Sequence, residues 1–311
     1  MTEPKPDFPA ARGRRWRALR DSILLQEDLN FLLTNRIPRI AASRFLGWFT
    51  RIRHPLVRGA SMALWRAATD LDLSDALKSR FDSVHDCFTR ELRPGARPLD
   101  PDPAVLLSPS DGIVGEHGII RHGQMLQAKG MPYTLPDLLG DEAAARASEG
   151  CCYVTIRLTS AMYHRFHAPQ DGMLVDVNHL DGDTWNVNPI ALKRVERLFC
   201  RNERAVLRLQ VEPAGATLRI VAVAAIGVSG LRLRGIPDRM RAGDGGLGRR
   251  DLGITVRRGE ELGGFEHGST LVILAPPGHV PRPGLAIGDR LRMGERLLVP
   301  GEVPEALSWL R

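Results

Sequence analysis

A glycine-rich stretch that ends in a serine and a threonine, Gly263–Thr270, precedes an apolar run. Glycine permits backbone torsions that other residues resist, and it leaves its own carbonyl sterically open. The hydroxyl of Ser269 could therefore attack the carbonyl of Gly268 and convert this peptide bond into an ester, with help from strain at a tight turn. An ordinary glycine-rich β-turn is the alternative, because such turns are common. Either interpretation predicts a tight turn that leads into a strand.

Two further stretches carry groups that could activate this serine. Asp111 lies in the turn Ser108–Gly112, where an aspartate is also an ordinary turn residue. His164 and His167 lie three positions apart, just after a predicted strand. Histidines at this spacing could bind a metal, but no clear third ligand accompanies them. A histidine pair without function and a general base oriented by an aspartate are the remaining interpretations.

A serine, a histidine and an aspartate together are the ingredients of an activated nucleophile. The hydrolase signature G-x-S-x-G is absent around Ser269. The carbonyl of Gly268, rather than an external substrate, is therefore the favoured target of the serine.

The chain resembles the phosphatidylserine decarboxylase family from about residue 80 to about residue 300. Each matching stretch is a weak signal alone, but all of them in the same order and spacing are highly specific. The stretches are Ser108–Gly112, Gln127–Gly130, Tyr163–Pro169, Trp185–Asn188, Phe199–Arg204 and Phe265–Thr270.

The resemblance implies a pyruvoyl enzyme that is made by self-cleavage between Gly268 and Ser269. Ser269 would become the N-terminal pyruvoyl group of the smaller chain, 269–311, which stays paired with the larger chain, 1–268. Asp111, His167 and Ser269 would form the cleavage triad, with His167 as the base, and His164 would serve decarboxylation. The pyruvoyl carbonyl would form a Schiff base with the amine of phosphatidylserine and yield phosphatidylethanolamine. Neither an external cofactor nor a metal is implied.

One departure from the family pattern lies beside the predicted cleavage bond. The familiar form has leucine before Gly-Ser-Thr, whereas this chain has His267. Both reacting residues are retained, so we still expect cleavage. The added titratable group bears on the pH dependence of maturation.

The order of the predicted elements indicates an α+β fold. Helical patterns occupy 21–35, 39–52 and 55–65, and a further short helical region is predicted over 70–86. Beyond residue 100 the texture changes to short strands, including 153–158, 205–211, 218–226 and 270–275, with a closing hairpin over 288–297. We therefore expect N-terminal amphipathic helices followed by a mainly antiparallel β core.

Charge divides the chain into two predicted parts. Residues 1–66 contain 13 Lys and Arg against 5 Asp and Glu, a net charge of +8, whereas the whole chain carries +7. The segment 39–52 also places Phe45, Trp48 and Phe49 between arginines, a pattern that suits the plane of a membrane interface. Ordinary helices packed on a domain are the alternative, and both can hold. We predict a membrane-associating segment, 1–66, and a catalytic domain, 67–311.

The expected location is the cytoplasmic face of the cell membrane, as a peripheral protein that contacts phosphatidylserine and an anionic surface. No apolar run approaches the ~18 residues that a spanning helix needs. Further dimerisation of the two-chain unit stays open. The rival functions are a decarboxylase of another serine-headed lipid or amino acid, and a non-enzymatic basic lipid-binding protein. Nucleic acid is disfavoured, because aromatic residues make up only 5% of the chain and no known reader motif occurs.

Overall fold

The computed structural model describes residues 31, 38–128, 131–212, 215–225, 230–240, 243, 245–266 and 269–302. Nearly all of the helix predicted over 21–35 lies outside these residues. Gly268 and His267 also lie outside them, so the predicted cleavage bond is described only from its Ser269 side.

An eight-stranded antiparallel sheet forms the centre of the fold. Its strands run in the order β12-β7-β8-β9-β14-β5-β2-β16, so β14 is interior to the sheet and pairs with β9 and β5. The bounds in that order are Gly248–Val256, Gly172–Leu180, Arg204–Val211, Ala216–Ala224, Ser269–Leu274, Cys152–Leu158, Gly112–Ile119 and Arg290–Leu291.

Three smaller antiparallel sheets complete the β structure of the described residues. The four-stranded one has the order β11-β10-β13-β6, the three-stranded one β1-β17-β15, and β3 pairs with β4. In the same order the bounds are Ile236–Met240, Leu231–Leu233, Glu261–Phe265, Arg165–His167, Leu106–Leu107, Arg296–Pro300, His279–Pro281, Gln124–Ala128 and Met131–Thr134.

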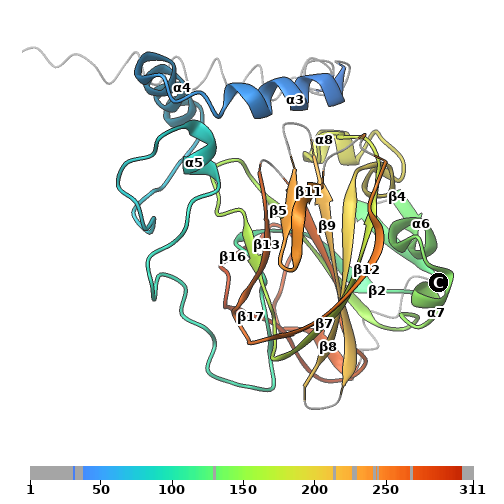
Figure 1. Cartoon of the computed structure of the whole chain (residues 1–311). Helices are drawn as coiled ribbons and strands as arrows, with labels where there is room; N and C mark the ends of the chain where they lie inside the picture. The colour runs from blue at the N-terminus through green and yellow to red at the C-terminus, as the bar shows by residue number, and fades with distance from the viewer. Residues whose placement is uncertain are drawn as a thin grey trace, which may run out of the picture.

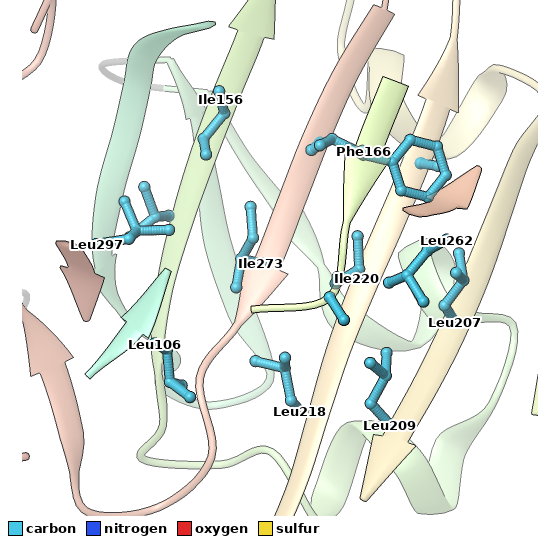
Figure 2. Packing of buried hydrophobic residues seen from close by; sticks show 14 of the residues in the cluster. Leu106, Ile156, Phe166, Leu207, Leu209, Leu218, Ile220, Leu262, Ile273 and Leu297 are labelled. Carbon is cyan, nitrogen blue, oxygen red and sulfur yellow. The ribbon is translucent and has the colours of Figure 1, made fainter. Parts of the chain in front are cut away.

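Both faces of the eight-stranded sheet are covered, which explains why its central strands are apolar on both sides. Side chains alternate between the two faces of a strand. On β14, Leu271 and Ile273 belong to one buried cluster, whereas Val272 and Leu274 belong to another. Figure 2 shows the first cluster, where Ile273 and Ile220 lie across from Phe166 and Leu262 of the four-stranded sheet. The four-stranded sheet therefore packs on the face that Leu271 and Ile273 share.

Four short helices cover the opposite face. They are α6 (Leu135–Leu139), α7 (Glu142–Arg146), α8 (Pro189–Leu192) and α9 (Leu198–Arg201), and their buried residues belong to the second cluster. Side-chain caps begin three of them: Thr134 accepts from the amide of Asp137, Asp141 from that of Ala144, and Asn188 from that of Ala191. These helices lie to the right of the sheet and above it in Figure 1.

Two longer helices lie together at one end of the molecule, at the top of Figure 1. They are α3 (Arg39–Phe49) and α4 (Pro55–Ala68), and α4 has proline in its first turn, where a missing N–H is tolerated. α3 buries Ser43 and Gly47 and exposes its large apolar residues. Beneath them α5 (Val84–Phe88) begins at Ser83, whose hydroxyl accepts from the amide of Asp86.

The predicted α+β class is confirmed, as are the helix starts near 39 and 55. The short helix predicted over 70–86 is wrong, because only α5 forms there. The predicted hairpin over 288–297 is also wrong: β16 pairs with β2, and β17 pairs with β1 and β15. Gly263 and Gly264 lie in strand β13 rather than in a turn. A Cβ at Gly263 would lie 2.4 Å from the carbonyl oxygen of Arg232, so close packing against β10 explains this glycine.

Candidate active site

Ser269 begins β14 at one end of the eight-stranded sheet, which we call the site end. At this end Ser269 pairs with Leu158, the last residue of β5, and with Ala224, the last residue of β9. Ile113 pairs with Arg157, so Gly112 at the start of β2 comes level with Leu158. Neighbouring strands lie about 4.8 Å apart, which places the backbones of Gly112 and Ser269 roughly 10 Å apart along the row, with Asp111 directly before Gly112.

The side chain of Ser269 is fully buried, at 0% exposure. It shares a face with Leu271 and Ile273, so it points to the side on which β13 and β6 pack. Within the described residues its Oγ has no hydrogen-bond partner. A buried hydroxyl without a partner costs free energy, so a residue at this position without a role is disfavoured.

Asp111 is held by a charged partner other than histidine. Arg97 donates to both of its carboxylate oxygens, Nε to Oδ1 at 2.8 Å and Nη2 to Oδ2 at 2.6 Å. The backbone amide of Met293 also donates to Oδ1, at 2.9 Å. Gly112 permits this position, because a Cβ there would lie 2.2 Å from Ile156. Two hydrogen bonds to a guanidinium and one to a backbone amide fix the position of this carboxylate.

His167 is buried on β6, and both of its ring nitrogens are hydrogen-bonded. Nδ1 lies 3.0 Å from the carbonyl oxygen of Gly259, which can only accept, so Nδ1 carries the proton. Nε2 lies 2.9 Å from the hydroxyl of Tyr163, which donates to it. Burial lowers the pKa of His167 from its ordinary 6.5, partly offset by the Gly259 carbonyl. The ring is therefore neutral at pH 7 and has the protonation state of a base.

His164 lies one residue before β6 and is held by contacts with three other segments. Its backbone oxygen accepts from the amide of Phe265, and its Nε2 donates to the carbonyl of Thr159, 3.0 Å away. Thr159 directly follows Leu158, the β5 partner of Ser269. The His164 ring is stacked on Phe88, with 3.9 Å between the ring centroids. The backbone and α5 together fix this imidazole next to the site end.

A polar cavity of about 460 Å³ lies beside these groups. Asp111, Tyr163 and Thr159 line it, together with Arg90. Arg90 is 6% exposed and donates to the carbonyl of Ala161, so this side of the cavity is fixed in place.

Two of the other matching stretches support the site end from the far side of Ser269. Asn202 donates to the carbonyls of Trp185 and Ala224, both at 2.8 Å, and accepts from the amide of Trp185. Ala224 in turn donates to the carbonyl of Glu203. The stretches 185–188 and 199–204 therefore hold the strand end that pairs with Ser269.

The structure gathers Asp111, His164, His167 and Ser269 around the site end but joins them to other groups. The recorded hydrogen bonds of these four described residues do not link Asp111, His167 and Ser269 to one another. The described residues contain no group of three or more His, Cys, Asp or Glu side chains placed to hold a metal ion.

The comparisons with known proteins agree on one family. The family model described as phosphatidylserine decarboxylase matches residues 84–299. The chain belongs to the phosphatidylserine decarboxylase family. Proteins named phosphatidylserine decarboxylase proenzyme are 38% identical over 268 residues in Anaeromyxobacter sp. strain K and 37% over 260 in Myxococcus xanthus strain DK1622. These alignments cover 84% and 81% of this chain and 94% and 91% of the relatives.

Membership of the phosphatidylserine decarboxylase family confirms the resemblance and the enzyme class predicted from the motifs. A phosphatidylserine decarboxylase proenzyme from Methylococcus capsulatus is 33% identical over 270 residues, covering 83% of this chain and 92% of the relative. The family match begins at residue 84 and so includes α5 and the whole site end, but not α3 or α4.

Three residues of this site were not singled out from the sequence: Arg97, Tyr163 and Phe88. Tyr163 lies inside a matching stretch, next to His164, and this position beside a candidate residue was the signal that could have identified it. Arg97 lies in a proline-rich loop, 14 residues before its partner Asp111. Phe88 contacts His164 only through the tertiary fold, so no local pattern marks it.

Proposed function

We propose that this chain is a proenzyme that cleaves itself between Gly268 and Ser269 and then converts phosphatidylserine to phosphatidylethanolamine. The single observation that supports it most is the buried hydroxyl of Ser269, at the start of an interior strand and without a hydrogen-bond partner among the described residues. Among the described residues, no hydrogen bond to this hydroxyl has to break before it attacks.

Cleavage begins with Oγ of Ser269 attacking the carbonyl carbon of Gly268, while its proton passes to a base. His167 is the proposed base, because burial keeps its ring neutral. The amide nitrogen leaves the Gly268 carbonyl and takes a proton, which converts the peptide into an ester. Loss of the Ser269 Cα proton then expels the Gly268 carboxylate, and water releases ammonia from the remaining end. The products are 1–268 and a smaller chain with an N-terminal pyruvoyl group.

Some rearrangement is needed for this first step. Nε2 of His167 is occupied by Tyr163, and Asp111 by Arg97. Tyr163 and Asp111 line the same cavity, so the triad can be completed by local motion around it. In this proposal Asp111 stabilises the protonated imidazole rather than taking the proton itself.

The residues present fit a pyruvoyl group at position 269. The group would be held by the pairing of β14 with β5 and β9, in a site that the chain buries completely. Its keto carbon supplies an electrophile for the amine of the substrate and accepts electron density when carbon dioxide leaves. His164, fixed by Thr159 and Phe88, is the proposed group that positions the substrate or returns a proton.

Membrane contact is assigned to α3 and α4, on the cytoplasmic face of the membrane. Phe45 and Trp48 of α3 are 57% and 63% exposed, and Leu56 and Leu64 of α4 are 77% and 71% exposed. Exposed apolar residues that cluster on one surface mark an interaction site. Arg44 and Arg58 lie among them in sequence, which favours an anionic lipid surface. Among the described helices, none combines the length and apolar character that crossing a bilayer requires.

Intact mass spectrometry of the purified protein tests the cleavage. We expect two chains, 1–268 and 269–311, the smaller with a blocked pyruvoyl end, and a single chain from Ser269→Ala. A wild-type protein that keeps its full-length mass after long incubation would contradict the proposal. Carbon dioxide release from phosphatidylserine in vesicles, compared with free serine, then separates a lipid decarboxylase from an amino-acid decarboxylase.

A further inference from the structure

Helix α3 lies across the site end and is anchored at its beginning. Arg39, its first residue, donates to both carboxylate oxygens of Asp183 at 3.0 and 2.5 Å. The guanidinium carbon of Arg39 also lies 3.7 Å from the ring centroid of Trp185. Ser43, on the buried side, lies 3.2 Å from the hydroxyl of Thr184. The first half of α3 is therefore fixed to the stretch that supports Ala224 and, through it, Ser269.

The other end of α3 is anchored to the segment that leads into the proposed cleavage bond. Arg51 follows the C-cap residue Thr50 and donates through Nη1 to the carbonyl of Gly47 in the last turn, at 2.5 Å. Its Nη2 donates to Oε2 of Glu266, also at 2.5 Å. Glu266 lies three positions before Ser269. One arginine side chain thus joins the end of the lipid-facing helix to the cleavage segment.

Glu266 is a buried carboxylate that basic groups surround. It is only 1% exposed. Besides Arg51, its Oε1 accepts from Nε of Arg232 at 3.2 Å and lies 3.8 Å from Nε2 of His85. Its backbone amide donates to the carbonyl of Gly230. Burying a charge is unfavourable unless it is paired and hydrogen-bonded, so the position of Glu266 depends on these partners.

We propose that Glu266 is a positioning residue for self-cleavage, and that Arg51 transmits lipid contact at α3 to the cleavage segment. This inference rests on the proposed function. The segment between Glu266 and Ser269 contains only two residues, so a fixed Glu266 limits where the Gly268 carbonyl can lie relative to Oγ of Ser269. Misplacement of a reacting atom by about 1 Å can reduce a rate on the order of 100-fold.

The contact between Arg51 and Glu266 also couples lipid binding at α3 to self-cleavage. Phe45 and Trp48, the exposed aromatic residues of α3, lie six and three positions before Arg51, respectively. Both aromatic residues lie within two helical turns of Arg51, so lipid contact that moves or fixes α3 also acts on Arg51. Arg51 in turn contacts Glu266 directly. Maturation should therefore respond to anionic vesicles, and the response should require the Arg51 side chain.

The test compares cleavage of newly made precursor in five forms. They are wild type, Arg51→Gln, Arg51→Lys, Glu266→Gln and the control Arg53→Gln. Arg53 is an exposed residue two positions from Arg51. Each precursor is incubated with and without vesicles of mixed phosphatidylglycerol and phosphatidylcholine, and the two chains are quantified on denaturing gels. Thermal unfolding of each precursor in its Ser269→Ala background reports folding separately from cleavage.

We expect cleavage to slow at least tenfold in Arg51→Gln and Glu266→Gln, with Arg51→Lys recovering part of the rate because it restores the charge. Vesicles should accelerate wild type and Arg53→Gln but not Arg51→Gln. Equal slowing and equal vesicle response in Arg51→Gln and Arg53→Gln would overturn the inference. The inference would also be overturned if vesicles accelerated Arg51→Gln as strongly as wild type while its unfolding temperature was lowered. That pattern would indicate that Arg51 only stabilises the fold. Failure of wild type to cleave at all would instead overturn the proposed function.

Discussion

Arg97 and Asp111 form a two-point ion pair in the lining of the polar cavity, with Nη2 and Oδ2 2.6 Å apart. The pair is mostly buried, with side-chain exposures of 8% and 12%. The carboxylate proposed to orient His167 therefore also has a structural partner, and a loss of cleavage in an Asp111 variant has two possible causes.

Asp111→Asn should both destabilise the precursor and prevent cleavage. Removing one partner of a buried pair costs about 3–5 kcal/mol, because a charge is left uncompensated. The double variant Arg97→Met with Asp111→Leu should recover most of that stability, since a well-packed apolar pair can replace a buried ion pair. It should still fail to cleave. Denaturant unfolding and gel analysis of the same samples make the comparison, and a stable double variant that cleaved normally would remove Asp111 from the triad.

Tyr163→Phe should move the pH dependence of cleavage rather than abolish cleavage. The Tyr163 hydroxyl donates to Nε2 of His167 and so competes with a proton for the same lone pair. Its removal favours the protonated ring and raises the pKa of His167, so the acid limb of the rate profile should move to higher pH. Above pH 8 the rate should stay within a few-fold of wild type. Cleavage time courses between pH 5 and 8.5 measure the shift, and an unchanged limb would mean that His167 is not the base.

His164→Ala should mature into two chains but decarboxylate poorly. Positioned acid–base groups contribute about 10²–10⁴-fold in rate, so kcat should fall by at least 100-fold while the gel pattern stays that of wild type. Phe88→Leu should keep the imidazole but loosen it, because the stacking at 3.9 Å is lost. We expect a loss of about tenfold there. Normal turnover by the His164 variant would remove this histidine from the catalytic residues.

Phe45→Ser with Trp48→Ser should weaken vesicle binding at every salt concentration. Each aromatic side chain contributes an apolar free energy that salt does not screen, so about tenfold weaker partitioning is expected at 1 M salt as well as at 0.15 M. Ile287→Ser provides the control, because Ile287 is 61% exposed but lies outside α3 and α4. Co-sedimentation with anionic vesicles is the measurement. Equal pelleting of the double variant and wild type would place the lipid contact elsewhere.

Point variants are needed for this question because truncation confounds two effects. Deleting everything before residue 67 should release the protein from vesicles, but it also removes Arg39 and Arg51, which contact Asp183 and Glu266. A truncated protein with low activity on vesicles should therefore also lose activity on a short-chain soluble substrate. The proposed division at 66 and 67 falls inside α4, which continues to Ala68.

The Ser269→Ala precursor should lose stability as the pH falls through 6.5. The pKa of His167 is lowered in the folded state, so below 6.5 the unfolded chain binds the extra proton. Stability linked to this residue is thus complete above 6.5 and decreases as the pH falls toward the folded pKa. His167→Gln should flatten this dependence in urea unfolding between pH 7 and 5. An identical slope in both proteins would show that His167 does not contribute to it.

Local patterns predicted the parts of this fold that depend on neighbouring residues. The apolar runs that became β5, β8, β9 and β14 need only burial on both faces. Helix α3 begins directly after Pro38, and α4 begins with Pro55. The stretch 70–86 carries helical spacing, but its residues Leu71, Leu73 and Phe81 instead pack into a small cluster with Met62 and Trp65 of α4. Tertiary contact there replaced the local preference.

The site residues were predictable through the matching stretches, whereas their partners were not. Ser269, Asp111, His164 and His167 stand out by type and spacing. Arg97 lies in a loop and Phe88 in a short helix, and no local sequence pattern indicates that either segment contacts the site. Sequence also suggested that Gly263 and Gly264 form the turn before Ser269. Glycine is needed at these positions because β13 lies very close to its neighbouring strands, which only a three-dimensional structure shows.

The location of Ser269 in the middle of the sheet has a consequence for how the protein is made. β14 exchanges six paired positions with β5 and six with β9, and residues beyond it supply β15, β16 and β17. If the backbone is cut before residue 269, as proposed, a denatured protein must bind its interior strand again as a separate chain, without the covalent link that kept it nearby. Meanwhile the edges of β5 and β9 that β14 normally covers would be unpaired and prone to aggregation. The uncut precursor should therefore refold from urea, whereas the mature two-chain form should precipitate. Folding to the native structure should thus be possible only before cleavage.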